Sequence, residues 1–222
     1  FHLQSPREPW RTGTGVRIMT SETQVVLIDD DPAIHASLDS LFRSVGQPFA
    51  SFPSTRAFLE AARPDVATCL VLDVRLPGQS GLEFQRELTR LQQPLPIIFI
   101  TGHGDIPMSV EAMKGGAIEF LTKPFRDQDI LDAVNRGLQL DRRRRQDLAR
   151  AEEVRERYRS LTPRERDVLA LVIDGRLNKE IAAHLDLSIV TVKVHRGHVM
   201  RKMGAGSVAE LVRLADRIAA GT

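Results

Sequence analysis

Five polar side chains in this 222-residue chain directly follow short apolar runs, where parallel strands would end. They are Asp29, Asp30, Asp73, Thr101 and Lys123. The carboxyl ends of parallel strands meet at one edge of an open sheet, so we expect these side chains to lie together. Three carboxylates in one place repel one another, and a set of oxygen ligands favours Mg²⁺. The pattern therefore predicts a magnesium site at which a carboxylate accepts a phosphoryl group.

Each residue type suits one part of that chemistry. Asp73 is the candidate nucleophile, and the Lys123 ammonium would neutralise the transferred oxygens together with the metal ion. The Thr101 hydroxyl could donate a hydrogen bond to one of those oxygens. Asp31 is interpreted as the first residue of a helix, because Pro32 follows it and carboxylates are favoured at helix N-termini.

Apolar runs alternate with amphipathic segments in the first two thirds of the chain. The runs predict strands buried on both faces, at residues 25–28, 49–52, 69–72, 97–100 and 117–121. The amphipathic segments predict helices at residues 33–45, 54–62, 107–114 and from 128 onward. Five strands that alternate with helices in this way favour an α/β fold with a doubly wound, five-stranded parallel sheet.

The composition is that of a globular protein, with 42% apolar and 27% charged residues. No apolar run approaches the length of a membrane span, so we expect a soluble protein that acts without a membrane. The single cysteine, Cys69, excludes an internal disulfide and fits a reducing cytoplasm. Residues 1–21 contain no periodic pattern, and we expect them to be a disordered or non-native extension.

Charge divides the chain into two parts. Residues 22–141 contain 17 acidic and 10 basic residues, a net charge of −7, whereas residues 142–222 contain 11 and 18, a net charge of +7. A basic C-terminal part indicates a nucleic-acid partner, although a solvated basic face without a partner gives the same count.

The C-terminal part is helical throughout by pattern. Residues 142–160 contain no Pro or Gly and predict a helical linker. Thr162-Pro163 and Glu165 form a capping-box pattern, and further helix starts at Asn178, Ser188 and Ser207 predict an all-α, four-helix domain over residues 161–222.

Residues 178–203 have the spacing of a helix-turn-helix. On its second helix, Val192, Val199 and Met203 should face the core, which leaves another face free for the major groove of DNA. That face contains Val190, Lys193, Val194 and Gly197. Candidate phosphate contacts are Lys179, Thr191, His195, Arg196, Arg201 and Lys202. A helical protein-docking domain is the alternative to DNA binding.

The acidic pattern resembles the receiver domains of bacterial two-component response regulators, which have a flavodoxin-like fold. The resemblance implies that Asp73 is the phosphoacceptor, that Lys123 contacts the phosphate through a turn with a cis Lys123–Pro124 bond, and that Thr101 and Phe120 form a switch pair. It also implies a set of Mg²⁺ ligands: Asp29, Asp30, Asp73 and the backbone carbonyl of Arg75. A phosphohydrolase with an aspartyl nucleophile is a rival, but its Asp-x-Asp-Gly-Thr pattern is absent after the first strand.

The C-terminal patterns are similar to the LuxR-type helix-turn-helix. These are Leu161-Thr162-Pro163-Arg164-Glu165, Asn178-Lys179-x-Ile181-Ala182 and Thr191-Val192-Lys193-Val194-His195. With residues 102–108, Gly-His-Gly-Asp-Ile-Pro-Met, they place the chain nearest the NarL/FixJ family of response regulators. Relatives often have a side chain where this chain has Gly197, and Gly115-Gly116 should loosen a turn near the surface that relatives use for dimer contacts.

The resemblance implies a receiver over residues 22–141 and a DNA-binding domain over residues 161–222. A sensor histidine kinase would phosphorylate Asp73, and the protein would then form a homodimer on promoter DNA. By analogy we expect activation through RNA polymerase. The chain would not be an enzyme beyond taking part in its own Mg²⁺-dependent phosphorylation and dephosphorylation. A regulator that binds DNA without phosphorylation is the remaining alternative, and the complete set of acidic-site residues counts against it.

Overall fold

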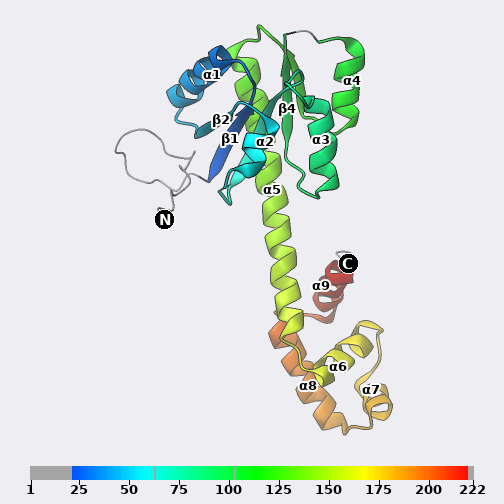
Figure 1. The fold of residues 1–222 in the computed structure, drawn as a ribbon. Helices are drawn as coiled ribbons and strands as arrows, with labels where there is room; N and C mark the ends of the chain where they lie inside the picture. Colours follow the sequence, from blue (N-terminus) through cyan, green and yellow to red (C-terminus); the bar gives the residue numbers. More distant parts are fainter. Residues whose placement is uncertain (1–21, 63, 103, 220–222) are drawn as a thin grey trace, which may run out of the picture. The chain divides into compact units, whose positions relative to one another are not determined.

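The computed structural model describes residues 22–62, 64–102 and 104–219. These residues form two compact units, which divide between Arg145 and Gln146 (Figure 1). The predicted extension at residues 1–21 lies outside the described residues. Among the described helices, none is long and apolar enough to cross a bilayer.

The N-terminal unit contains a five-stranded parallel sheet. Its strands are β1 (Thr23–Ile28), β2 (Phe49–Phe52), β3 (Ala67–Asp73), β4 (Ile97–Thr101) and β5 (Glu119–Thr122). They lie in the order β2-β1-β3-β4-β5, and each neighbouring pair is parallel. This is the flavodoxin-like order of a doubly wound sheet, so the fold prediction is confirmed.

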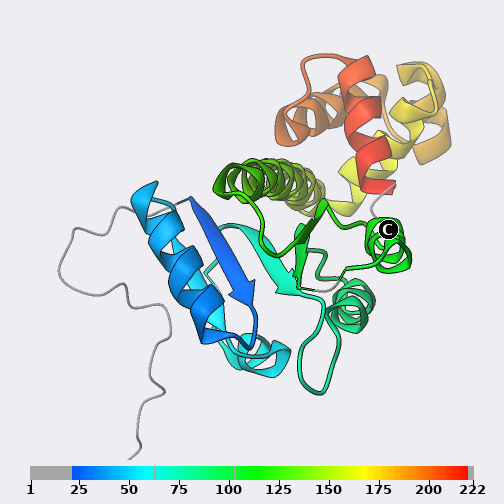
Figure 2. The same ribbon diagram turned by 90° about the horizontal axis from the view of Figure 1, so that it is seen from above.

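Helices cover both faces of the sheet. The first four are α1 (Pro32–Ser44), α2 (Thr55–Glu60), α3 (Gly81–Arg90) and α4 (Ile106–Lys114). Alternate residues of each strand face opposite sides. Val26 of β1 packs in the core that α2, α3 and α4 cover, and Val25 packs in the core of α1 and α5 (Asp127–Arg159). Figure 2 shows α5 and α3 on opposite sides of the sheet.

Helix α5 is 33 residues long and continues through the stretch predicted as a linker, as far as Arg159. The sequence contains no Pro or Gly after Gly137 in this helix, so nothing interrupts its hydrogen bonds. Buried Asp141 accepts a hydrogen bond from the backbone N–H of Thr68 at 2.9 Å and pairs with Arg144 at 2.6 Å and Arg145 at 3.0 Å. The last receiver helix and the predicted linker are therefore one helix.

The C-terminal unit has the four predicted helices α6 (Pro163–Ile173), α7 (Asn178–Leu185), α8 (Ile189–Met203) and α9 (Val208–Ala219). Thr162 and Glu165 form the predicted capping box of α6. Gly175 and Gly204 end α6 and α8 with φ of +78° and +68°, a region that glycine adopts without strain. Val168, Ile181 and Val192 come from three different helices and meet in one buried core with the end of α5.

Candidate functional site

Three carboxylates meet at the carboxyl ends of β1 and β3. Asp29, Asp30 and Asp73 each place one carboxylate oxygen within 4.8 Å of the others. Asp29 and Asp73 are buried, whereas Asp30 is exposed. The sequence placed these residues at one edge of the sheet, and the structure brings them together there. Two of the three charges are thus held in the protein interior. Repulsion between charges is stronger there than in water.

Lys123 joins the two buried carboxylates. Its Nζ lies 2.6 Å from Asp29 Oδ2 and 3.2 Å from Asp73 Oδ2. The turn after β5 positions it: the Lys123–Pro124 bond is cis, as the resemblance implied, and the Lys123 N–H donates to the Thr101 carbonyl at 2.7 Å. One ammonium between two carboxylates leaves the cluster with a net negative charge.

Backbone N–H groups orient the carboxylates of Asp29 and Asp73. Asp29 Oδ1 accepts the N–H of Asp31 at 2.9 Å, and Asp73 Oδ1 accepts the N–H of Arg75 at 3.2 Å. Asp31 itself is the N-cap of α1 and accepts the N–H of Ala33 at 2.8 Å, as predicted. His35 Nε2 donates to the Asp29 carbonyl at 2.6 Å, which gives this histidine a structural contact.

Burial and charge shift the protonation of the two central groups in the same direction. Burial raises the pKa of Asp73, and the Arg75 N–H and the Lys123 charge only partly oppose this effect. Burial lowers the pKa of Lys123, but its hydrogen bonds and charge pairing with Asp29 and Asp73 outweigh this, so that its pKa is raised overall. Lys123 therefore stays an ammonium, and Asp73 is a more basic carboxylate than a solvated aspartate.

The cluster fits a small divalent cation. All its ligand atoms are oxygens, and three carboxylates face one ammonium, so a Mg²⁺ ion would balance the remaining charge. The exposed side of Asp30 leaves a path from solvent. The N–H of Arg75 contacts Asp73, while a role for the Arg75 carbonyl as a ligand stays a prediction.

Thr101 and Phe120 lie on the neighbouring strands β4 and β5. Thr101 is fully buried at the end of β4, and Phe120 is half-buried in β5 with its ring centroid 6.4 Å from that of Phe99. Gly104 makes room for this ring, because a Cβ there would lie 2.7 Å from Phe120 Cε1. Sequence reasoning missed this role of Gly104, which only the packing of the loop shows.

The whole of helix α3 is a second feature that sequence reasoning missed. Gly81 opens this helix against β3, where a Cβ would lie 2.3 Å from the Asp73 carbonyl oxygen. Ser80 and Glu83 form a capping box, with Ser80 Oγ accepting the Glu83 N–H at 3.2 Å. The Ser-x-x-Glu spacing was a signal in the sequence that could have placed this helix.

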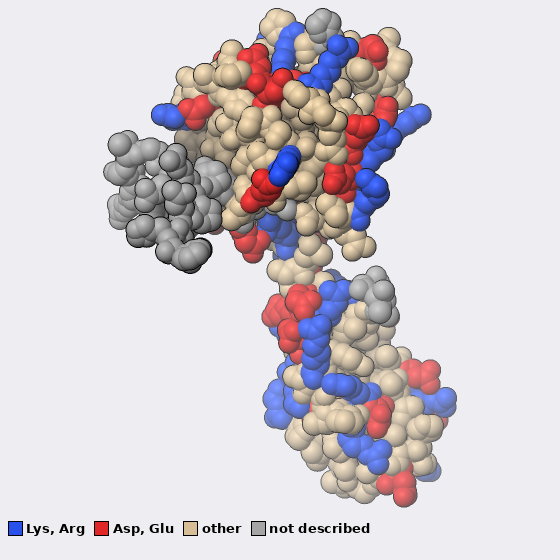
Figure 3. All heavy atoms as spheres, viewed as in Figure 1, with Lys and Arg blue, Asp and Glu red and all other residues tan. Residues whose placement is uncertain are grey.

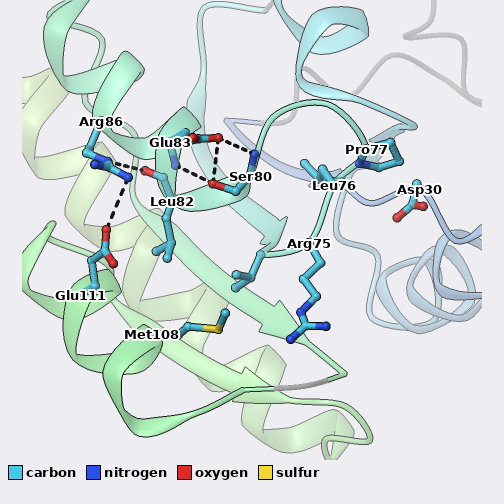
Figure 4. A pocket seen from close by; sticks show the side chains of 11 residues that line it. Asp30, Arg75, Leu76, Pro77, Ser80, Leu82, Glu83, Arg86, Met108 and Glu111 are labelled. Carbon is cyan, nitrogen blue, oxygen red and sulfur yellow. Dashed lines mark hydrogen bonds and ion pairs between the residues drawn. The ribbon is translucent and has the colours of Figure 1, made fainter.

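A shallow cavity of about 580 Å³ adjoins the acidic cluster (Figure 4). Asp30 and Arg75 line its end near the cluster, and residues of the segment between β3 and α3, of α3 and of α4 line the rest. Figure 4 shows Arg86 of α3 facing Glu111 of α4, and their charged atoms lie 3.5 Å apart. The cavity gives solvent and small solutes access to the space around Asp30.

The predicted faces of α8 are confirmed. Val192, Val199 and Met203 are buried, whereas Val190 and Val194 are 71% and 51% exposed. The other two members of the second face, Lys193 and Gly197, are also exposed. The turn before α8 contains Asp186 at φ +53°, a left-handed conformation that aspartate tolerates.

Some candidate phosphate contacts already have partners within the unit. Lys202 Nζ lies 2.7 Å from the carboxylate of buried Glu165, and this hydrogen bond, with the one from the Thr162 N–H, lowers the pKa of Glu165 to about 2. Arg196 Nη1 donates to Asn178 Oδ1 at 2.9 Å, and His195 Nδ1 is buried without a hydrogen-bond partner in the described chain. Lys179, Lys193 and Arg201 are exposed. Space-filling shows basic residues over the C-terminal unit (Figure 3).

Comparison with known proteins supports both units. Residues 25–135 match the response regulator receiver domain, and residues 159–215 match the bacterial regulatory proteins of the luxR family. Nodulation protein W of Bradyrhizobium diazoefficiens is 50% identical over 96% of this chain and 93% of that protein. The chain belongs to the NarL/FixJ family of response regulators.

Further relatives of this response regulator match it along both units. The transcriptional regulatory protein FixJ of the same organism is 42% identical over 90% of this chain and 97% of that protein. A low-resolution structure of the response regulator StyR has a TM-score of 0.81 and 47% identity, covering 89% of this chain and all of StyR. The protein is thus a phosphorylation-dependent, DNA-binding transcriptional regulator of a two-component system, with a sensor kinase and DNA as partners.

Proposed function

We propose that Asp73 accepts the phosphoryl group that switches this regulator. The observation that supports this most is the convergence of two buried carboxylates on Lys123, with Asp73 as the partially accessible member. Asp29 is completely buried and its second oxygen bonds the Asp31 N–H, so it is suited to holding charge rather than to attack.

In this proposal, an Asp73 carboxylate oxygen attacks the phosphorus of a phosphohistidine in the kinase. A P–O bond to Asp73 forms as the P–N bond breaks, and the histidine imidazole leaves. Asp29, Asp30, Asp73 and the Arg75 carbonyl would hold Mg²⁺, which supplies positive charge for the transferred oxygens. Lys123 and Thr101 would contact those oxygens as well. The chain needs no activity on any other substrate, so we class it as a regulator and not an enzyme.

The new charge on Asp73 would be read out through Thr101 and Phe120. The Thr101 hydroxyl would move toward the phosphoryl oxygens, and Phe120 would turn inward into the space that this movement opens. Helix α4 follows this loop and exposes Ile106, Val110 and Met113 at helical spacing, an apolar strip suited to a partner copy. We therefore infer that phosphorylation favours a homodimer through α4 and β5.

The DNA-binding unit would then contact a two-fold symmetric promoter site. The exposed face of α8, with Val190, Lys193 and Val194, would enter the major groove. Lys179, Thr191, His195 and Arg196 would contact the phosphate backbone, whereas Lys202 would do so only by giving up its pair with Glu165. Because bacterial promoter DNA lies in the cytoplasm, we place the protein there, with RNA polymerase as the partner it activates.

The intact mass of the protein after incubation with acetyl phosphate and Mg²⁺ tests the phosphoacceptor. We expect one added phosphoryl group on the wild type and none on Asp73→Ala. Asp39→Ala, in the exposed part of α1, is the matched control and should gain the same mass as the wild type. An adduct on Asp73→Ala would contradict the assignment of Asp73, and no adduct on the folded wild type would favour the constitutive DNA binder.

A further inference from the structure

Gly197 lies inside α8, where the fold gives no reason for a glycine. It is the ninth of the 15 residues of this helix and has no positive φ. A Cβ built at Gly197 would meet nothing within 4 Å. Glycine lowers the stability of a helix interior relative to alanine, because it loses more conformational freedom on folding.

At other positions of the chain, the fold itself requires a glycine. A Cβ at Gly137 would lie 2.4 Å from Cys69 Sγ, so α5 can approach β3 only without a side chain there. Gly204 has a φ of +68°, which a side chain would strain. Gly197 has neither property within the described residues, which directs attention to contacts that it could make outside the unit.

The surroundings of Gly197 indicate what that contact is. It lies on the same exposed side of α8 as Val190 and Val194, one turn after Lys193 and one turn before Arg201. Exposed apolar side chains beside two cations complement a surface that is apolar in places and anionic around them. The C-terminal part of the chain carries a net charge of +7, which favours DNA as that surface.

We propose that Gly197 is a specificity-determining residue, whose missing side chain lets the backbone of α8 approach the edge of a base pair in the major groove. Glycine allows such close approach to a ligand. The same approach would bring Val190 and Val194 to thymine methyl groups, the apolar feature of the groove. This inference rests on the proposed DNA-facing side of α8.

The proposal predicts opposite effects on folding and on binding. Gly197→Ala should raise the stability of the C-terminal unit, since the helix gains propensity and the new methyl group meets no atom. The same methyl group should hold α8 away from the bases and weaken sequence-specific binding. Gly197→Leu should weaken it further. A glycine that is merely tolerated would predict the gain in stability without any loss of binding.

The experiment uses the full chain, phosphorylated with acetyl phosphate and Mg²⁺. The wild type first selects its preferred duplex from a random double-stranded DNA library, and affinities are then measured for that duplex and for a scrambled version. Gly197→Ala and Gly197→Leu are compared with Ala170→Leu, which adds a side chain at an exposed position of α6. Denaturant unfolding and intact mass verify folding and phosphorylation of each variant.

We expect Gly197→Ala to bind the selected duplex about tenfold more weakly than the wild type, the size of one lost base-pair contact. Its affinity for the scrambled duplex should stay within about twofold, because phosphate contacts dominate that binding. Wild-type affinity of Gly197→Ala for the selected duplex would overturn the proposal, and so would an equal loss on both duplexes. If the phosphorylated wild type enriches no duplex, the DNA-binding assignment itself fails.

Discussion

Lys123 is the residue on which the acidic site depends most. Among the described ion pairs, it is the only cation within 4 Å of Asp29 and Asp73. Its ammonium balances part of the charge of Asp29 and Asp73, which burial would otherwise make costly. One ammonium does not balance three carboxylates, so the site would need a divalent cation as well.

Lys123→Met should lower the free energy of unfolding of the receiver by about 3 kcal/mol, because it leaves buried carboxylates unpaired. Added Mg²⁺ should recover part of that loss by binding the same carboxylates. Hydrogen exchange of the β1 and β3 amides, with and without Mg²⁺, measures both effects. Lys114→Met, at the exposed end of α4, is the control. Equal stability of Lys123→Met and the wild type would contradict the account.

Glu165→Gln should lower the stability of the C-terminal unit by about 2 kcal/mol at neutral pH, since it removes the charged partner of Lys202. The hydrogen bonds from Lys202 and from the Thr162 N–H together lower the folded-state pKa of Glu165 to about 2, below its ordinary value of 4.5. Its stabilisation is therefore complete above pH 4.5 and is lost as the pH falls towards 2.

Hydrogen exchange of the α6 and α8 amides over this pH range checks the prediction for Glu165. The wild type should lose protection as the pH falls through the window, and Glu165→Gln should lose less, because it has no carboxylate there to protonate. Parallel loss in the two proteins would show that other groups cause the acid sensitivity.

A few contacts of helix α5 determine where the receiver ends. Its Asp141 is fully buried and binds the backbone of β3 as well as Arg144 and Arg145. These contacts hold α5 to the N-terminal end of β3, because Thr68 is near the start of this strand. Asp73 lies at the other end of β3. The arginines that the sequence assigned to a linker thus pack against the receiver.

Asp141→Ala should destabilise the receiver by about 3 kcal/mol, because the Thr68 N–H and two guanidinium groups lose their buried partner. Denaturant unfolding followed by hydrogen exchange of β3 measures this loss. Asp147→Ala, in an exposed part of the same helix, should leave the stability within about 0.5 kcal/mol of the wild type. Similar behaviour of the two variants would exclude an anchoring role for Asp141.

The exposed strip on α4 makes a separate prediction about assembly. Val110→Glu places a charge in the middle of the apolar strip and should abolish phosphorylation-dependent dimers while leaving phosphorylation of Asp73 intact. Val45→Glu, at the exposed end of α1, is the matched control. Sedimentation velocity gives the oligomeric state. Dimers of phosphorylated Val110→Glu would show that the interface lies elsewhere.

Most elements could be predicted from the sequence because their signals are local. Buried parallel strands appear as apolar runs, and capped helices start at residues such as Thr162 and Ser188. The five acidic-site residues were found for the same reason, since strand ends fix their places. The roles of Gly81 and Gly104 were not found, because each depends on a Cβ that would collide with a residue of another element. The pair of Lys202 with Glu165 also joins distant positions, and no spacing rule indicates it.

The whole molecule combines an acidic receiver and a basic DNA-binding unit in one chain. Each unit has its own buried core, so each can keep its fold while the switch acts. In the proposed switch, one phosphoryl group on Asp73 changes the association of the entire protein. A small local charge can have this effect only if two phosphorylated subunits associate more tightly than two unmodified subunits.

Sedimentation velocity of the full chain with Mg²⁺, before and after acetyl phosphate, measures this change in association. We expect a shift from monomer to dimer for the wild type and no shift for Asp73→Asn, at equal protein concentration. Intact mass of the same samples reports how much protein is phosphorylated. A wild type that is fully phosphorylated yet sediments as it did before treatment, or an Asp73→Asn variant that dimerises on treatment, would contradict the account.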